Sequence, residues 1–189
     1  MFGSKKRLGL AVAAGVALCS TAANNPSALD LTGKPQNPLT SRAPATVLLF
    51  VRTDCPITNR YAPELQRLAQ EFKTRSVAFW LIYPDPDEAP RHIEDHIREY
   101  AFPGDPLRDP HHVLVKQAHA TVAPEAAVFN ASGKLVYHGR IDDRYIDIGK
   151  TRPAAQVHDL EEAIRAVLSG KPVAHPETRA VGCSLADIE

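Results

Sequence analysis

The residues best suited to chemistry in this chain are its three cysteines, Cys19, Cys55 and Cys183. Cys55 stands where the apolar run "VLLFV" stops, Pro56 follows it, and a helical pattern begins soon after. The start of a helix lowers the pKa of a nearby thiol, because unpaired N–H groups and the positive end of the helix dipole stabilise a thiolate. Cys55 is therefore the candidate nucleophile.

The residues around Cys55 modify this expectation. Arg52 and Arg60 add positive charge, which favours a thiolate, while Asp54 opposes it. Thr58 occupies the position three residues after Cys55, so a Cys-X-X-Cys pair is impossible here. Either Thr58 or Asn59 can cap the helix by accepting from free N–H groups.

A thiol nucleophile needs a second thiol to complete a redox cycle. Attack on a peroxide gives a sulfenic acid, and attack on a disulfide gives a mixed disulfide, and each product is resolved by another thiol. Cys183 is the internal candidate. A permanent Cys55–Cys183 bridge is the alternative, and by closing a loop of more than 100 residues it would stabilise the fold by about 4–5 kcal/mol. The sequence leaves both readings open.

The first 22 residues have the pattern of a secretory signal peptide. A basic segment precedes eleven apolar residues, 8–18, and small residues at 20 and 22 suit cleavage after Ala22. The run is shorter than the roughly 20 residues of a membrane-spanning helix. Lipoprotein anchoring at Cys19 is less favoured, because bulky Leu18 precedes it. We expect an extracytoplasmic protein, secreted or periplasmic, with residues 23–189 forming one domain and 171–189 an extended tail.

Charge and composition exclude one class of partner. Without residues 1–22 the chain has 19 basic and 22 acidic side chains, a net charge of about −3 with histidine neutral. No basic stripe remains, so nucleic acid is not an expected partner.

The elements that must position Cys55 are readable from apolar patterning. Continuous apolar runs at 45–51 and 76–83 predict buried strands, and helical spacing follows each of them. Residues 111–119 suit a short helix, and 125–130 and 134–139 suit an antiparallel hairpin. A last helix has its apolar face between Val157 and Leu168, ahead of Gly170. The lead-in from Ala28 to Leu39 and the stretch "FPGDPLRDP" read as turns.

This order, β-α-β-α-(α)-β-β-α, predicts an α/β fold with a mixed central sheet and helices on both faces. The last two strands are too close together for a crossover helix, which excludes a fully parallel sheet.

Several segments resemble one superfamily. "VLLFVRTDCP" followed by "YAPEL" resembles the strand, active-site cysteine and kinked helix of thioredoxin-like proteins, with Pro63 eight residues after Cys55. "TVAPEAAVFN" resembles their cis-proline segment and makes Pro124 the candidate. "DCPITNRYAPE", "GRIDDRYIDIGKTRP" and "AVGC" resemble the secreted redoxin group related to peroxiredoxins, the alkyl hydroperoxide reductase and thiol-specific antioxidant superfamily.

The resemblance implies a thiol-dependent oxidoreductase with antioxidant activity, acting on peroxides or protein disulfides. It implies catalytic Cys55 with Cys183 as resolving thiol, no cofactor, and a thiol reductant or partner protein. Thr58, Arg52, Pro124 and Arg140 are the candidate supporting residues.

The sequence departs from each well-known motif of these relatives. Peroxiredoxins carry Thr or Ser three residues before the peroxidatic cysteine and Pro seven before it, where this chain has Arg52 and Leu48. Thr53 and Thr58 are the hydroxyls that can substitute. Sco-type copper chaperones carry a second cysteine where this chain has Asn59.

The alternative function is a non-catalytic binding module for copper or a partner protein, with a structural disulfide. Copper would need Cys55, Cys183 and one histidine to meet. His92 and His96 are spaced for a metal pair, but a polar helix face is the favoured interpretation, and no metal site is assigned. Arg140 belongs to "GRIDDR", whose charges suit internal ion pairs better than an anionic ligand.

Overall fold

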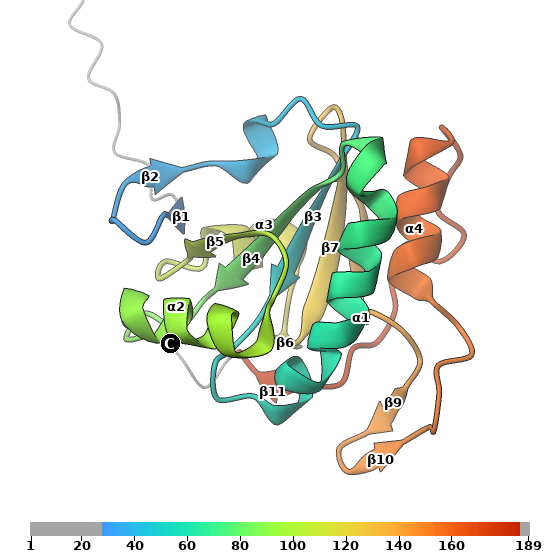
Figure 1. The fold of residues 1–189 in the computed structure, drawn as a ribbon. Helices are drawn as coiled ribbons and strands as arrows, with labels where there is room; N and C mark the ends of the chain where they lie inside the picture. Colours follow the sequence, from blue (N-terminus) through green and yellow to red (C-terminus); the bar gives the residue numbers. More distant parts are fainter. Residues whose placement is uncertain (1–27, 186–189) are drawn as a thin grey trace, which may run out of the picture.

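The computed structural model describes residues 28–185 and has a seven-stranded mixed sheet at its centre (Figure 1), in the order β2-β1-β5-β4-β3-β7-β8. The strands of this sheet are β1 (Ala28–Leu29), β2 (Pro35–Gln36), β3 (Ala45–Phe50), β4 (Ala78–Tyr83), β5 (Asp105–Arg108), β7 (Glu125–Asn130) and β8 (Leu135–Gly139). The helices are α1 (Pro56–Phe72), α2 (Pro90–Tyr100), α3 (Val113–Ala118) and α4 (Asp159–Leu168), with short 3-10 turns at Pro38–Thr40 and Lys73–Arg75.

Two smaller ladders lie outside the central sheet. β9 (Tyr145–Asp147) pairs with β10 (Lys150–Thr151), and β6 (Val122–Ala123) pairs with β11 (Cys183–Ser184). The second ladder matters for the site, because it brings Cys183 and Ser184 of the segment 171–185, called the tail below, beside the residues that precede β7.

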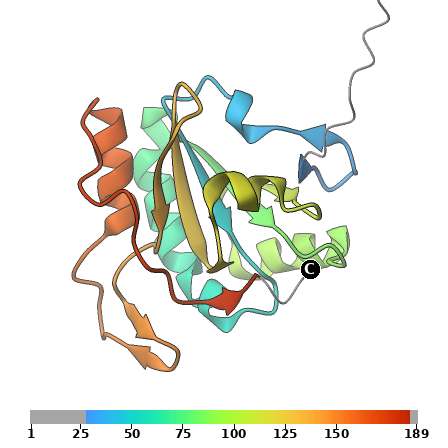
Figure 2. The ribbon, with the colours of Figure 1, turned by 180° about the vertical axis from the view of Figure 1, so that it is seen from behind.

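The central strand β3 divides the core in two. It runs parallel to β4 and antiparallel to β7, and all six of its residues are buried. Because side chains alternate along a strand, Val47 and Leu49 face the layer of α1, α2 and α4, while Leu48 and Phe50 face α3. Figures 1 and 2 show the two layers from opposite sides. This confirms the predicted α/β fold with helices on both faces.

The predicted core elements are present. The strand at 125–130 matches β7, and the antiparallel β7–β8 hairpin is confirmed. The helices after each apolar run are α1 and α2, and the short and last predicted helices are α3 and α4.

Two segments expected as turns contribute strands, so those expectations are wrong. "FPGDPLRDP" contains β5, which pairs parallel to β4. Pro106 is tolerated there because the outer side of β5 is almost an edge, meeting β1 at the single pair Leu29↔Arg108. The lead-in contains β1 and β2.

Between residues 28 and 185, no helix is long and apolar enough to span a membrane. The predicted signal peptide, including Cys19, lies outside the described residues.

Candidate active site

Cys55 is the N-cap of α1, in extended backbone geometry with φ −90° and ψ 111°. The expectation that Thr58 or Asn59 caps the helix is wrong, because the helix already begins at Pro56. Proline suits the first helical position, since its missing N–H would have had no intrahelical partner and its fixed φ is helical. Cys55 therefore stands at the end of the helix where free N–H groups favour a thiolate, although in the disulfide its sulfur accepts no capping hydrogen bond from them.

Cys55 and Cys183 form a disulfide across 128 residues of sequence, with their Cα atoms 6.1 Å apart. Strand β11 delivers Cys183 by pairing antiparallel with β6, where Cys183 lies opposite Ala123. Cys55 is fully buried in this state, whereas Cys183 retains partial exposure.

The segment facing the disulfide contains the expected cis-proline. The Ala123–Pro124 peptide bond is cis, and the carbonyl oxygen of Ala123 lies 3.1 Å from the Cys55 sulfur. The tail passes very close to this segment at Gly182, where a Cβ would lie 2.2 Å from the Ala123 oxygen. A residue without a side chain is therefore required at position 182 for the tail to dock as it does.

Arg52 connects Cys55's loop to the tail. Its Nη1 donates to the carbonyl oxygen of Ser184 at 2.8 Å, and its Nε and Nη2 donate to the Asp54 carboxylate at 3.0 and 2.8 Å. The hydrogen bond from Arg52 lowers the pKa of Asp54. Sequence reasoning treated Arg52 as a charge favouring the thiolate, but its charge is paired and the side chain fastens the tail strand.

The two hydroxyls near Cys55 differ. Thr53 donates its hydroxyl to the Glu88 carboxylate in a short hydrogen bond. Thr58 is fully buried, and its hydroxyl has no hydrogen-bond partner among the described residues. Thr58 is consequently the hydroxyl still available in the first turn of α1.

His96 is a buried residue that sequence reasoning placed on a polar helix face, and that expectation is wrong for it. Its Nδ1 lies 2.9 Å from the Tyr83 hydroxyl, and its Nε2 lies 2.8 Å from Oδ1 of Asn59. Because Oδ1 can only accept, Nε2 carries the proton and Nδ1 accepts from Tyr83. Burial lowers the pKa of His96, so the imidazole is held neutral. His96 lies three residues after the buried Ile93 and so on the same face of the helix, and this spacing was the sequence signal for its burial.

The neighbouring His92 is exposed, as expected, and its Nδ1 lies 3.3 Å from a Glu88 oxygen. His92 and His96 therefore do not act as a pair. Both sulfurs of the proposed copper site are joined in the disulfide, so they offer no thiolate in this state.

Arg140 contacts the tail at Thr178 and α4 at Asp159, rather than the helix start that carries Cys55. Its Nε donates to Asp159 Oδ2 at 2.7 Å, and this bond raises the pKa of Arg140. Its backbone N–H donates to the Thr178 hydroxyl at 3.2 Å. Arg140 and Asp143 of "GRIDDR" are paired, with Asp159 and Arg152, whereas Asp142 Oδ2 and Arg144 Nε have no hydrogen-bond partner among the described residues. Arg140 helps hold the tail upstream of Cys183.

A cavity of about 690 Å³ lies beside the docked tail. Glu125 and His138 contribute buried polar groups to it, with 3.7 Å between Glu125 Oε1 and His138 Nδ1. The lining residues are His119, Thr121, Glu125, His138, Glu177, Thr178, Arg179 and Ala180. Half of this lining belongs to the tail, so the docked tail forms one wall of the cavity.

A buried cysteine at a helix start, facing a cis-proline on a mixed sheet, defines the class of thioredoxin-like redoxins. The sequence profile of the AhpC/TSA family matches residues 22–138, more than half of the chain. The chain belongs to this family. The matched residues include Cys55 and end before the tail that carries Cys183.

Solved structures with the same fold extend over most of the chain. A hypothetical protein from Sinorhizobium meliloti is 24% identical with a TM-score of 0.71, covering 84% of this chain and 88% of its own. An uncharacterized conserved protein from Geobacillus kaustophilus is 26% identical with a TM-score of 0.70, covering 85% and 88%.

A secreted disulfide oxidoreductase from Mycobacterium tuberculosis is 18% identical with a TM-score of 0.52, covering 76% of this chain and 94% of its own. At this identity the likeness shows the fold alone. No curated protein matches this chain.

Proposed function

We propose that this protein is an extracytoplasmic thiol–disulfide oxidoreductase in which Cys55 is the nucleophile and Cys183 the resolving thiol. One observation carries the proposal. The two cysteines of residues 28–185 form a disulfide in which one sulfur caps a helix and the other arrives on a short two-residue strand. A pair built from a helix start and a strand outside the central sheet can open without disturbing that sheet.

The chemistry balances as a two-step exchange. The Cys55 thiolate attacks a substrate disulfide, which forms a mixed disulfide and expels one substrate thiolate. The Cys183 thiolate then attacks Cys55 Sγ, which forms the intramolecular disulfide and releases the second substrate thiolate. An external dithiol of a reductase protein returns both cysteines to thiols.

Burial predicts where the external dithiol attacks. Cys55 is fully covered, whereas Cys183 is partly exposed, so an incoming thiolate reaches the Cys183 sulfur first. Cys55 is then the leaving group, and the helix start favours its departure as a thiolate. Once the bond opens, release of β11 uncovers Cys55 for its substrate.

Peroxide is the second candidate substrate. The hydroxyl of Thr53 is bound to Glu88, whereas that of Thr58 is buried without a partner and lies in the first turn after Cys55. A hydroxyl that positions a peroxide would therefore come from Thr58. Loss of peroxide consumption in Thr58→Val, with disulfide exchange retained, would support this second activity.

The experiment uses the chain from residue 23, prepared oxidised. We expect reduction by a dithiol to release two thiols, and the reduced protein to reduce a model protein disulfide through Cys55. Cys55→Ser should abolish the exchange, whereas Cys183→Ser should accumulate a mixed disulfide at Cys55. His92→Gln, an exposed change, is the matched control and should retain full rate.

A binding module with a fixed disulfide is the alternative that this experiment separates. A disulfide that resists thioredoxin-type dithiols while the protein is folded would refute the proposed cycle. Tight one-to-one Cu(I) binding by the reduced protein, lost in Cys55→Ser and without exchange activity, would favour copper as the cargo of such a module.

A further inference from the structure

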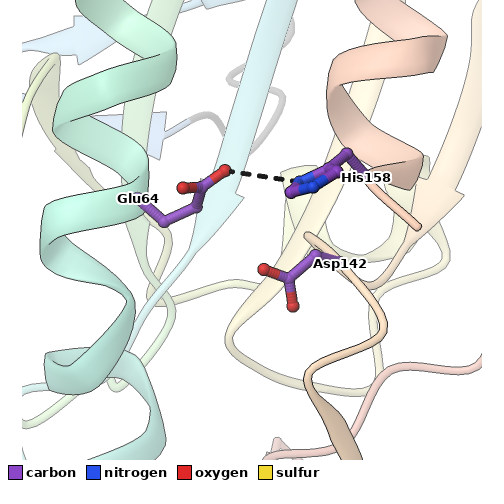
Figure 3. Close-up of side chains that lie close together, drawn as sticks. All are labelled: Glu64, Asp142 and His158. Carbon is purple, nitrogen blue, oxygen red and sulfur yellow. Dashed lines mark ion pairs between the residues drawn. The ribbon is translucent and has the colours of Figure 1, made fainter. Parts of the chain in front are cut away.

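Three side chains from separate segments meet between α1 and α4 (Figure 3). Glu64 comes from α1, Asp142 from the loop after β8, and His158 from the N-cap of α4. One ligand atom from each lies within 4.8 Å of the other two. His158 Nδ1 and Glu64 Oε1 are 3.9 Å apart, which is too long for a hydrogen bond.

Asp142 supplies the buried charge of this cluster. Only 1% of the residue is exposed. Its Oδ1 accepts from the Tyr61 hydroxyl at 2.6 Å and from the Arg144 backbone N–H at 2.9 Å. Its Oδ2 is buried and has no hydrogen-bond partner among residues 28–185. A buried carboxylate oxygen left in this way is costly unless a cation or a proton donor satisfies it.

His158 presents the same deficit. Its Nδ1 is buried without a hydrogen-bond partner in the described part of the chain, although the rest of the ring is half-exposed. The unsatisfied imidazole nitrogen and the unsatisfied carboxylate oxygen lie beside a second carboxylate. A metal ion would satisfy both atoms, because each offers it a lone pair.

We propose that Glu64, Asp142 and His158 bind one divalent first-row ion, of the kind represented by Zn²⁺ or Mn²⁺. One imidazole and two carboxylates suit such ions, whereas Ca²⁺ and Mg²⁺ prefer oxygen ligands alone and Cu(I) prefers sulfur. Bonds of about 2.0–2.2 Å place neighbouring ligand atoms about 3–4 Å apart, so small rotations of Glu64 and His158 complete the site.

The surroundings orient the ligands and set the local charge. Tyr61 fixes the Asp142 carboxylate through its hydroxyl, and Arg67 fixes the Glu64 carboxylate with bonds of 3.0 and 2.6 Å. Arg67 is shared with Glu71 and Glu161, so acidic side chains surround it. Outer contacts of this kind hold ligands in place for a metal. The bound ion would join α1 to the start of α4, independently of the disulfide.

The test uses tag-free oxidised protein, because its two described cysteines then offer no thiolate. Zn²⁺ is titrated in competition with a chelating indicator, and Co²⁺ is added separately to observe its visible absorption bands. We expect one equivalent to bind. Asp142→Asn keeps the acceptor for Tyr61 and should weaken binding by at least about 10- to 100-fold, the range for loss of an outer contact of a ligand, as should His158→Gln. His92→Gln, a change of an exposed histidine outside the cluster, is the matched control for His158→Gln and should leave the affinity unchanged.

Folding is checked in parallel by far-UV circular dichroism and thermal unfolding. At the same Zn²⁺ concentration the Tm of the wild type should rise more than that of His158→Gln. His158 is half-exposed, so this variant is the one expected to keep the fold. Absence of one-to-one binding would overturn the proposal, and so would equal affinity in wild type and His158→Gln. A crystal grown with Zn²⁺ that shows only water between the three side chains would overturn it as well.

Discussion

Two regions fasten C-terminal elements to α1, and they use different physics. At the start of α1 the tail is held by a covalent bond, a two-residue ladder and one arginine, Arg52. Along the flank of α1, helix α4 is held by apolar packing and by ion pairs that join Arg67 to Glu161 and Arg165 to Glu71. We expect the first attachment to respond to reductant and the second to salt, so that reduction would release the tail and leave the helical layer in place.

Removing the disulfide should have the largest effect on stability. Cys183→Ser should lower the free energy of unfolding by about 3–5 kcal/mol, because the unfolded chain loses a cross-link that spans 128 residues. Urea unfolding of the variant, of oxidised wild type and of reduced wild type measures the effect. Variant and reduced wild type should coincide, and a variant as stable as the oxidised protein would show that the tail attachment contributes little.

A side chain at position 182 should hinder docking of the tail while both cysteines remain. Gly182→Ala should cost about 1–3 kcal/mol in the oxidised protein, because its Cβ would meet the Ala123 carbonyl oxygen. In the reduced protein the cost should nearly vanish, since the tail can leave. Gly33→Ala is the control, with positive φ and open space around it. Equal costs in both redox states would contradict a releasable tail.

A third contact holds α2 to the first turn of α1 through His96 and should respond to pH. The folded pKa of His96 lies below its ordinary value of 6.5, so the unfolded chain binds the extra proton first. Stability from the neutral imidazole is therefore complete above pH 6.5 and falls as pH drops below it, by at most about 1.4 kcal/mol per unit.

Denaturant unfolding between pH 7 and pH 5 measures that slope. His96→Gln should flatten it, while His92→Gln should leave it as in wild type. A slope that survives in His96→Gln would assign the titration to another group.

The smallest effect is expected on the flank of α1. Arg67→Met should cost about 0.5–1 kcal/mol at low salt, because the guanidinium is partly exposed and its pairs are screened. At about 1 M salt the difference from wild type should shrink. Thermal unfolding at both salt concentrations tests this, with Arg98→Met, an exposed i,i+3 pair on α2, as the control. A salt-independent loss would mean that Arg67 acts through packing.

The sequence was sufficient where apolar patterning dominates. The run at 45–51 becomes β3, because a continuous apolar run suits a strand that is buried on both faces of the sheet. The short turn around Gly133 joins β7 to β8 as an antiparallel hairpin. The sequence failed for β5, whose Pro106 and charged neighbours carry no strand signal and which is a strand only because β4 offers it a partner. Local propensity cannot report a ladder that depends on a distant chain.

The candidate site shows the same limit. The cysteine pair was accessible from the sequence because only two cysteines follow the signal-like segment. The roles of Arg52 and His96 could not be predicted from the sequence. Arg52 donates to a carbonyl oxygen 132 residues away, and His96 on α2 contacts Asn59 on α1. The Glu64, Asp142 and His158 cluster combines three segments with no motif spacing, so only the folded chain reveals it.

The span of the disulfide has a consequence for biosynthesis. Cys183 is translated 128 residues after Cys55, and at about 5–20 residues per second that is a delay of about 6–26 s. During that interval Cys55 has no Cys183 with which to pair, and in an oxidising compartment its thiol can pair with other thiols. A nascent chain at this stage would need a reducing environment or an isomerase until Cys183 emerges.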